Sequence, residues 1–305
     1  MRRLSHYLSA LSIVIGTSLT GCAHPGDTVD QALERCRLDG ATSRNQQDET
    51  TPGGLFCRGI AAEDRNHNEA EAFKWFLKSA QADYAPAQFF VGSMYEQGDG
   101  VAKDLHKALA WHLKAAKQGL VEGQNQYAII LYYGRDGIEA NPAMAVPWFQ
   151  KAAAKGLANS QTMLGEAYYD GKGIAQNKAE AVKWYTLAAN QHHQHAMYVL
   201  GILYLLGDGT AKNEEVGITW LKQSAETNYP VAQLNLAKAY LNGSDKVKDL
   251  FAADMWFNVY LLNTPGDRQA DVDLAEKGLT PAQIADAKQK AEEVWKAMQS
   301  AENAA

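Results

Sequence analysis

Six of the seven tryptophans in this 305-residue chain recur at an almost fixed interval. Seven residues before each of the six stands Asn or Asp, the residue types that best accept hydrogen bonds from the free amides of a helix start. Each interval therefore contains at least one capped helix, and a period in the thirties is typical of stacked helical repeats. Successive members are 36 residues apart, with one interval of 37, and the set is Trp75, Trp111, Trp148, Trp184, Trp220 and Trp256.

A second pattern precedes most of these capped helices. It consists of a small residue, an apolar residue four positions later that is followed directly by Gly or Ala, and then Tyr or Leu. A glycine turn such as Gly98-Asp-Gly100 follows, where glycine adopts a positive φ without steric cost. The 37-residue interval has its extra residue between Gly134 and Gly137, in a turn. The helices therefore set the period, and the sequence predicts helix pairs joined by glycine turns.

Together these patterns resemble the Sel-1-like repeat, a relative of the tetratricopeptide repeat, over residues 51–263. The resemblance implies an all-α fold, a right-handed α-solenoid of about six helix pairs. The first repeat is expected to be degenerate, because Ala62-Glu-Asp64 replaces its glycine turn. Residues 264–305 are expected to cap the array, with a final helix that begins at Thr280-Pro281 and has Gln283 placed for a capping box.

The N-terminal residues resemble the leader of a bacterial lipoprotein. An apolar run over residues 8–19, too short to span a bilayer, ends in Leu19-Thr20-Gly21-Cys22. Residues 1–21 are therefore expected to be removed as a signal peptide, with Cys22 becoming the acylated first residue; an ordinary secretory signal is the alternative. Because Ala23 and not Asp follows the cysteine, the resemblance implies sorting to the periplasmic side of the outer membrane.

Residues 22–50 are expected to form a linker that contains one short helix. Cys36 and Cys57 are the cysteines that remain once Cys22 is acylated, and the periplasm is oxidising. They are expected to form a disulfide that closes a loop of about twenty residues. A reactive or metal-binding thiol pair is the alternative, although no histidine or second thiol pair lies nearby in the sequence.

The sequence predicts no catalytic residue, metal site or cofactor. The glycine turns lack the Lys-Ser/Thr of a phosphate loop, and the cluster His192-His193-x-His195 has no carboxylate or cysteine close to it. Some relatives of the repeat family bind or hydrolyse β-lactams, but this chain has no Ser-x-x-Lys. A formal charge of −6 without a basic run argues against nucleic acid as a partner. The chain is expected to be monomeric.

Positions that vary between repeats are expected to mark the binding surface. On the first helix of each pair, a stripe with spacing i, i+4, i+7 is apolar and aromatic where a solvated face would be polar. First helices line the concave groove of such solenoids, and aromatic side chains are frequent anchors. Packing between helices is the alternative for part of the stripe. The candidate partner-binding residues are Phe89, Ile129, Tyr132, Tyr169, Tyr198 and Leu205.

These features predict a lipid-anchored scaffold that holds a protein partner in the periplasm or at the outer membrane. Two versions resemble members of the family: an assembly lipoprotein of an envelope secretion machine, or an immunity protein that neutralises a type VI effector such as a phospholipase. A β-lactam-interacting or hydrolytic protein is a third, disfavoured alternative. The recurring tryptophan is interpreted as inter-helix packing, so Trp184→Ala is expected to cost several kcal/mol of stability.

Overall fold

The computed structural model describes residues 28–41, 50–66, 68–264, 266 and 269–304. Within these ranges the regular structure is helical, apart from an isolated bridge between Arg135 and Ile138. The predicted all-α fold is therefore confirmed. The expected signal peptide and Cys22 lie outside the described residues. None of the described helices combines the length and the apolar character needed to cross a bilayer.

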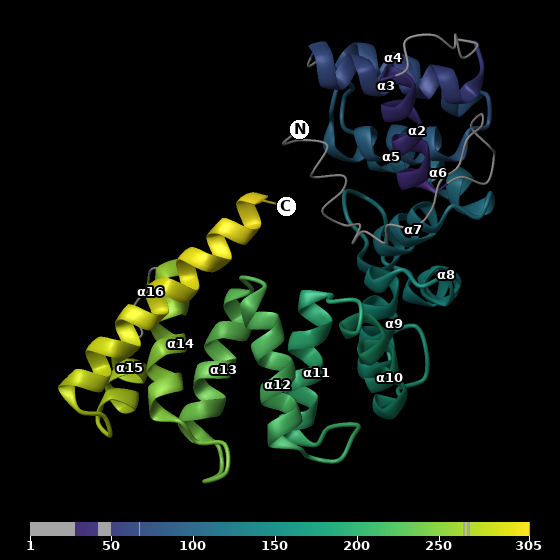
Figure 1. The fold of residues 1–305 in the computed structure, drawn as a ribbon. Coiled ribbons are helices and arrows are strands. Elements are labelled where there is room, and N and C mark those ends of the chain that lie inside the picture. Colours follow the sequence, from purple (N-terminus) through teal and green to yellow (C-terminus); the bar gives the residue numbers. More distant parts are fainter. Residues whose placement is uncertain (1–27, 42–49, 67, 265, 267–268, 305) are drawn as a thin grey trace. The chain divides into compact units, whose positions relative to one another are not determined.

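Helix pairs follow one another along the described chain, and consecutive helices pack together over residues 52–154 and over residues 178–263, as in an α-solenoid (Figure 1). The first helices are α3 (Pro52–Asn66), α5 (Ala85–Gln97), α7 (Val121–Tyr133), α9 (Ala158–Asp170), α11 (Gln194–Leu206) and α13 (Pro230–Asn242). The second helices are α4 (Glu69–Gln81), α6 (Leu105–Lys117), α8 (Pro142–Ala154), α10 (Lys178–Ala189), α12 (Glu214–Glu226) and α14 (Leu250–Asn263). The flanking helices are α2 (Val29–Ala41), α15 (Gln269–Glu276) and α16 (Pro281–Ala304).

The chain divides into two compact units. Unit 1 comprises residues 1–167 and 171–175, and unit 2 comprises residues 168–170 and 176–305. Within unit 2, α11, α12, α13 and α14 stand side by side, and α16 lies along α14 (Figure 1). Within unit 1, helices α3 to α8 pack in chain order.

The predicted helix caps are confirmed. At the start of α16, Thr280 N donates to Gln283 Oε1 at 2.9 Å and Gln283 N donates to Thr280 Oγ1 at 3.3 Å, which completes the capping box. Residues 62–64 lie within α3, which continues to Asn66, so the first repeat has no glycine turn at this position. In the second helices, the capping side chain accepts a hydrogen bond from the amide three residues later, and the caps are Asn68, Asp104, Asn141, Asn177, Asn213 and Asp249.

The core residue of each second helix is the one after the tryptophan. Five of the six tryptophans are only partly buried. Three of them lie beneath a lysine one turn later, as Trp148 does beneath Lys151, whose Nζ is 4.1 Å from the ring centroid. Trp184 is itself partly buried, and its neighbour Tyr185 is buried more fully. The residues after the tryptophans are between 0% and 3% exposed, and they are Phe76, His112, Phe149, Tyr185, Leu221 and Phe257.

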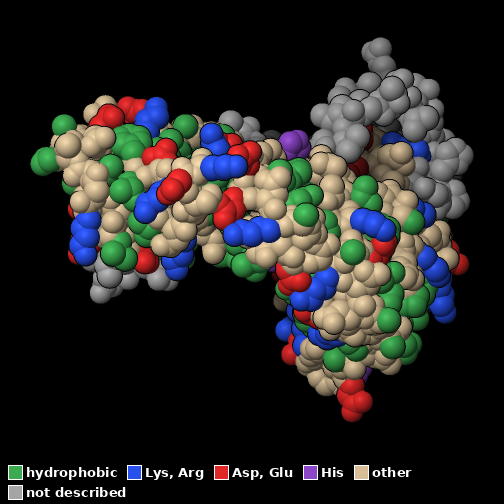
Figure 2. Space-filling view, turned by 90° about the horizontal axis from the view of Figure 1, so that it is seen from below, with side chains coloured by type: hydrophobic (Ala, Val, Ile, Leu, Met, Phe, Trp, Pro, Cys, Tyr) green, Lys and Arg blue, Asp and Glu red, His purple; other side chains and the backbone are tan. Residues whose placement is uncertain are grey.

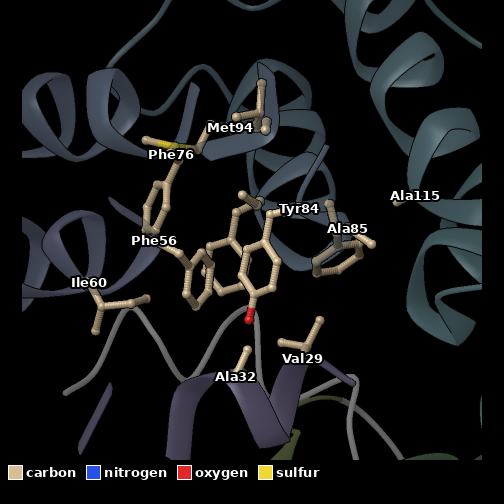
Figure 3. Close-up of a cluster of buried hydrophobic side chains, with 14 of the residues drawn as sticks. Val29, Ala32, Phe56, Ile60, Phe76, Tyr84, Ala85, Met94 and Ala115 are labelled. Carbon is tan, nitrogen blue, oxygen red and sulfur yellow. The ribbon is translucent and has the colours of Figure 1, made fainter. Parts of the chain in front are cut away.

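Helix α2 is an integral part of unit 1. Val29 and Ala32 are each 1% exposed and belong to one hydrophobic cluster with Phe56 of α3. In Figure 3 both side chains point from α2 toward the ring of Tyr84, which lies beside Phe56. The described part of the expected linker is thus packed against the first repeats, and its apolar side chains are removed from water.

A disulfide joins this helix to the first repeat. Cys36 of α2 and Cys57 of α3 are bonded with an S–S distance of 2.03 Å. The bond closes a loop across residues 42–49, so it restricts the separation of α2 from α3 in the unfolded chain.

Candidate interaction surface

The structure places two of the predicted groove residues in the core. Tyr132 is 0% exposed and its ring centroid lies 5.7 Å from that of Phe149 in an edge-on contact. Phe89 is 8% exposed and lies 5.5 Å from the ring of His112. An anchor for a partner must reach solvent, so the prediction that Tyr132 and Phe89 bind a partner is wrong. Ile129 stays partly exposed.

The exposed aromatic residue of α7 is Tyr133, which the stripe did not include. Tyr133 is 50% exposed, and its hydroxyl lies 3.3 Å from Glu166 Oε1 of α9. A shift of one residue turns a side chain by about 100° around the helix axis. The sequence pattern places the stripe on a helix but does not fix its rotation closely enough to choose between Tyr132 and Tyr133.

Tyr169 is occupied by contacts within unit 2. Its hydroxyl donates to Asp208 Oδ2 at 2.8 Å, and Lys178 Nζ lies 2.8 Å from the same oxygen. The hydrogen bond to Asp208 raises the pKa of the Tyr169 hydroxyl, and the bond from Lys178 lowers the pKa of Asp208. These hydrogen bonds connect Tyr169 to the turn after α11. The hydroxyl of Tyr169 therefore already has a hydrogen-bond partner within the protein.

The remaining two candidates, Tyr198 and Leu205, are partly exposed on α11. They adjoin the most exposed large apolar side chain in the described chain, Leu206, at 67%, and Val231 of α13 is 44% exposed. We call this set the α11–α13 surface. It consists of Tyr198, Ile202, Leu205, Leu206, Val231, Leu234 and Leu241.

An aromatic cluster extends the α11–α13 surface at the start of these helices. The ring of Tyr198 lies 5.8 Å from that of Tyr229, whose hydroxyl oxygen is 3.1 Å from His195 Nδ1. Burial lowers the pKa of His195, and burial together with the charge of His195 lowers the pKa of His193 to about 4. Both imidazoles are therefore neutral at neutral pH, and this end of the surface carries no charge.

The histidine cluster serves capping and packing. His193 Nδ1 accepts a hydrogen bond from the amide of Ala196 at the start of α11. Across the described ranges, no three His, Cys, Asp or Glu side chains are grouped so that they could hold a metal ion. Figure 2 shows Lys and Arg side chains interspersed with Asp and Glu over the face in view.

The helix pairs, their caps and the apolar face on the first helices define a helical-repeat protein of the kind that binds other proteins. The chain belongs to the Sel1 repeat family, whose fold is a scaffold for protein interactions and is generally non-enzymatic. The family model, described as Sel1 repeat, matches residues 55–84, 85–120, 121–157, 158–193, 194–229 and 230–258.

Solved structures with the same repeat are similar to this chain. A Sel1 repeat protein from Oxalobacter formigenes is 26% identical with a TM-score of 0.66, over 76% of this chain and 98% of that one. A protective antigen present in uropathogenic Escherichia coli strains, displaying an SLR fold, is 23% identical with a TM-score of 0.51, over 90% and 70%. An immunity protein from Pseudomonas aeruginosa is 18% identical, over 84% and 90%, and its TM-score of 0.44 is too low to carry its role over.

Curated relatives match only a short stretch. Chitin synthase regulatory factor 3 of Schizosaccharomyces pombe is 44% identical over 59 residues, which are 19% of this chain and 6% of the relative. The chain thus spans a small fraction of the curated relatives it matches, and this similarity concerns the repeat alone.

Proposed function

We propose that this protein is a lipid-anchored scaffold of the bacterial envelope and that it binds a protein partner through the α11–α13 surface. The observation that carries the proposal is the set of large apolar side chains left in water on two neighbouring first helices, with Leu206 at 67% and Val231 at 44% exposed. Large apolar side chains that are left exposed are candidates for an interaction site. Full burial of a Leu or Val side chain contributes roughly 1.5 to 3 kcal/mol.

The location rests on two further features. The leader that ends in Cys22 resembles a lipoprotein signal, and the Cys36–Cys57 disulfide favours an oxidising compartment such as the periplasm. Labelling with a palmitate analogue, followed by separation of inner and outer membranes, tests the anchor. The wild type is expected to carry the label and to separate with the outer membrane. Cys22→Ser is expected to lose both the label and the outer-membrane location. An unlabelled wild-type protein would contradict the anchor.

Partner binding is tested with a variant of the surface and a matched control. The double variant Leu206→Ser, Val231→Ser removes the two most exposed apolar side chains of the α11–α13 surface. Leu187→Ser is the control, because Leu187 is 47% exposed on the second helix α10, outside that surface. A partner captured from the periplasmic fraction is purified and titrated against all three proteins. The double variant is expected to bind about tenfold or more weakly.

The control variant is expected to bind as the wild type does. Equal affinity of the wild type and the double variant would contradict the proposed surface. The nature of the partner then separates the two versions of the function. A component of an envelope machine supports the assembly scaffold. A secreted toxin whose activity this protein blocks supports the alternative, an immunity protein.

A further inference from the structure

The outer face of the second helices differs between the two units. Three residues after the repeat tryptophan, the second helices of unit 1 carry a lysine, whereas α10 and α12 of unit 2 carry Leu187 and Gln223. The repeat fold therefore does not require a lysine at this position. The lysines of α4, α6 and α8 are Lys78, Lys114 and Lys151.

Helices α6 and α8 carry this basic character without a carboxylate of their own. Neither helix contains Asp or Glu. Lys155 Nζ donates to the carbonyl oxygen of Gly119, which follows α6, at 2.8 Å, so the ends of the two helices lie side by side. Four ammonium groups therefore gather here on a chain whose formal net charge is −6. The exposed lysines in the last turns of the two helices and directly after α8 are Lys114, Lys117, Lys151 and Lys155.

Apolar side chains accompany these lysines. Trp111 and Trp148 are partly exposed, and Met144, one turn before Trp148, is 51% exposed. Lys114 Nζ lies 3.9 Å from the ring centroid of Trp111, so charge and ring occupy the same patch of surface. Tryptophan and lysine side chains together are typical of protein surfaces at the level of lipid headgroups. We call the four lysines together with Trp111, Met144 and Trp148 the α6–α8 face.

The start of α2 lies at the end of α6. Val29 belongs to one hydrophobic cluster with Ala115, in the last turn of α6, and with Leu120, in the turn that follows. Val29 and Ala115 are both labelled in the close-up of this cluster (Figure 3). Burial raises the pKa of Glu122, at the start of α7, and a hydrogen bond from the backbone of Val29 opposes this rise. The first residues of α2 therefore pack beside the lysine-bearing end of the α6–α8 face.

The acylation site of the proposed lipid anchor is close to this point in the sequence. Residues 23–27 separate Cys22 from Thr28, so this stretch of chain spans at most about 20 Å. Acyl chains on Cys22 that are inserted in a bilayer therefore keep the start of α2 near the membrane surface. The ends of α6 and α8 are kept there with it.

Positive charge is in excess at this end of unit 1. In the first turn of α2 and in the turns that follow α4, α6 and α8, the carboxylates are Asp30 and Asp83, which are both exposed. The carboxyl group of Glu122 is 7% exposed and is turned away from the surface. Two exposed carboxylates are thus set against the four exposed lysines of the α6–α8 face.

We propose that the α6–α8 face rests on the surface of a bilayer that contains anionic phospholipid. Its lysines pair with lipid phosphates, and its tryptophans and Met144 lie among the headgroups. Each lysine at an anionic membrane surface strengthens binding by about fivefold. The inference rests on the lipid anchor of the proposed function, and the α11–α13 surface, which belongs to unit 2, takes no part in it.

The test compares the full-length protein in three environments: vesicles of phosphatidylethanolamine and phosphatidylglycerol, vesicles of phosphatidylcholine, and detergent. A water-soluble reagent acetylates exposed lysines, and mass spectrometry measures the rate at each one. The four lysines of the α6–α8 face are expected to react at least about threefold more slowly in the phosphatidylglycerol vesicles than in the other two environments. The internal controls are Lys183 of α10 and Lys222 of α12, which are exposed on second helices of unit 2 and are expected to react at one rate throughout.

Two double variants with the same loss of charge test whether the lysines cause the contact. Lys114→Gln, Lys151→Gln is expected to bring the two remaining lysines of the α6–α8 face to the rate that they show in detergent. Lys183→Gln, Lys222→Gln is expected to leave all four lysines of the face protected. The four substituted side chains are exposed, so unchanged thermal melting shows that both variants are folded.

Equal rates at the α6–α8 face in all three environments would overturn the inference, and so would unchanged protection in Lys114→Gln, Lys151→Gln. Flotation of the vesicles separates this failure from failure of the anchor. A protein that floats with both kinds of vesicle but shows no protection refutes the face alone. A protein that floats with neither refutes the anchor and the face together. Flotation with the phosphatidylglycerol vesicles alone, with the face protected, supports the face and refutes the anchor.

Discussion

A buried carboxyl group in the last repeat makes the stability of unit 2 dependent on pH. Asp254 of α14 is 0% exposed, and its Oδ2 has no hydrogen-bond partner among the described residues, while Oδ1 accepts from Asn258 at 3.0 Å. Burial, with a contribution from the charge of Glu276, raises the pKa of Asp254 from 3.8 to about 6. Glu276 pairs with Lys288 of α16 at 2.8 Å, so Asp254 lies where α14, α15 and α16 meet.

The sign of the effect follows from proton binding. The folded state holds the proton of Asp254 up to about pH 6, whereas the unfolded chain releases it near pH 3.8. The free energy of unfolding therefore falls as the pH rises from about 4 to about 6 and stays lower above that. Two pH units correspond to roughly 3 kcal/mol. Relaxation of the surrounding helices around the ionised carboxylate reduces this penalty, so we expect about 1 to 2 kcal/mol.

Replacement of Asp254 by Asn removes this cost. Asp254→Asn keeps the acceptor for Asn258 and cannot ionise, so it is expected to raise the free energy of unfolding at pH 7 by about 1 to 2 kcal/mol. At pH 4 it is expected to change little. Urea unfolding followed by circular dichroism at both pH values measures the difference, with Asp286→Asn, an exposed position on α16, as the control. The quantity to compare is the gain in unfolding free energy of Asp254→Asn over the wild type. An equal gain at pH 7 and at pH 4 would refute the reasoning.

Three further predictions concern the core, the N-terminal helix and the turns. Phe149→Ala is expected to lower the free energy of unfolding by about 3 to 5 kcal/mol, because Phe149 is 0% exposed. Trp148→Ala is expected to lower it by less than about 2 kcal/mol, because Trp148 is partly exposed. Equal losses of the two variants in chemical unfolding would contradict this. Cys36→Ser is expected to cost about 3 kcal/mol and to speed hydrogen exchange in α2; unchanged exchange would show that packing alone holds the helix. Gly209→Ala is expected to lower the melting temperature more than Gly156→Ala does. Both glycines have a positive φ, but only at Gly209 does backbone lie within 4 Å of the added Cβ. Similar losses in the two variants would mean that this contact contributes little to stability.

The repeat and its helix boundaries were predictable because they depend on local chemistry. Asn177 and Asp249 cap their helices with a bond to an amide three residues away, and such a short-range bond is visible in the spacing alone. The capping box of Thr280 and Gln283 was predictable for the same reason. Helix α3 continues through residues 62–64, where no glycine is present to end it.

The candidate site was only partly predictable. A period of 36 residues places a stripe on a helix but leaves its rotation uncertain, so Tyr132 was chosen where Tyr133 is exposed. His112 was not predicted, although it fills a core position that is Phe in three other repeats, and its Nε2 lies 3.4 Å from Glu96 Oε2. The signal that could have identified it is its place directly after a repeat tryptophan.

The sequence by itself determined the class of fold, the register of the helices and the caps, because these follow from hydrogen bonds and apolar spacing within one repeat. Only the tertiary structure decided which side chains face water, since burial depends on how each helix is turned against its neighbours.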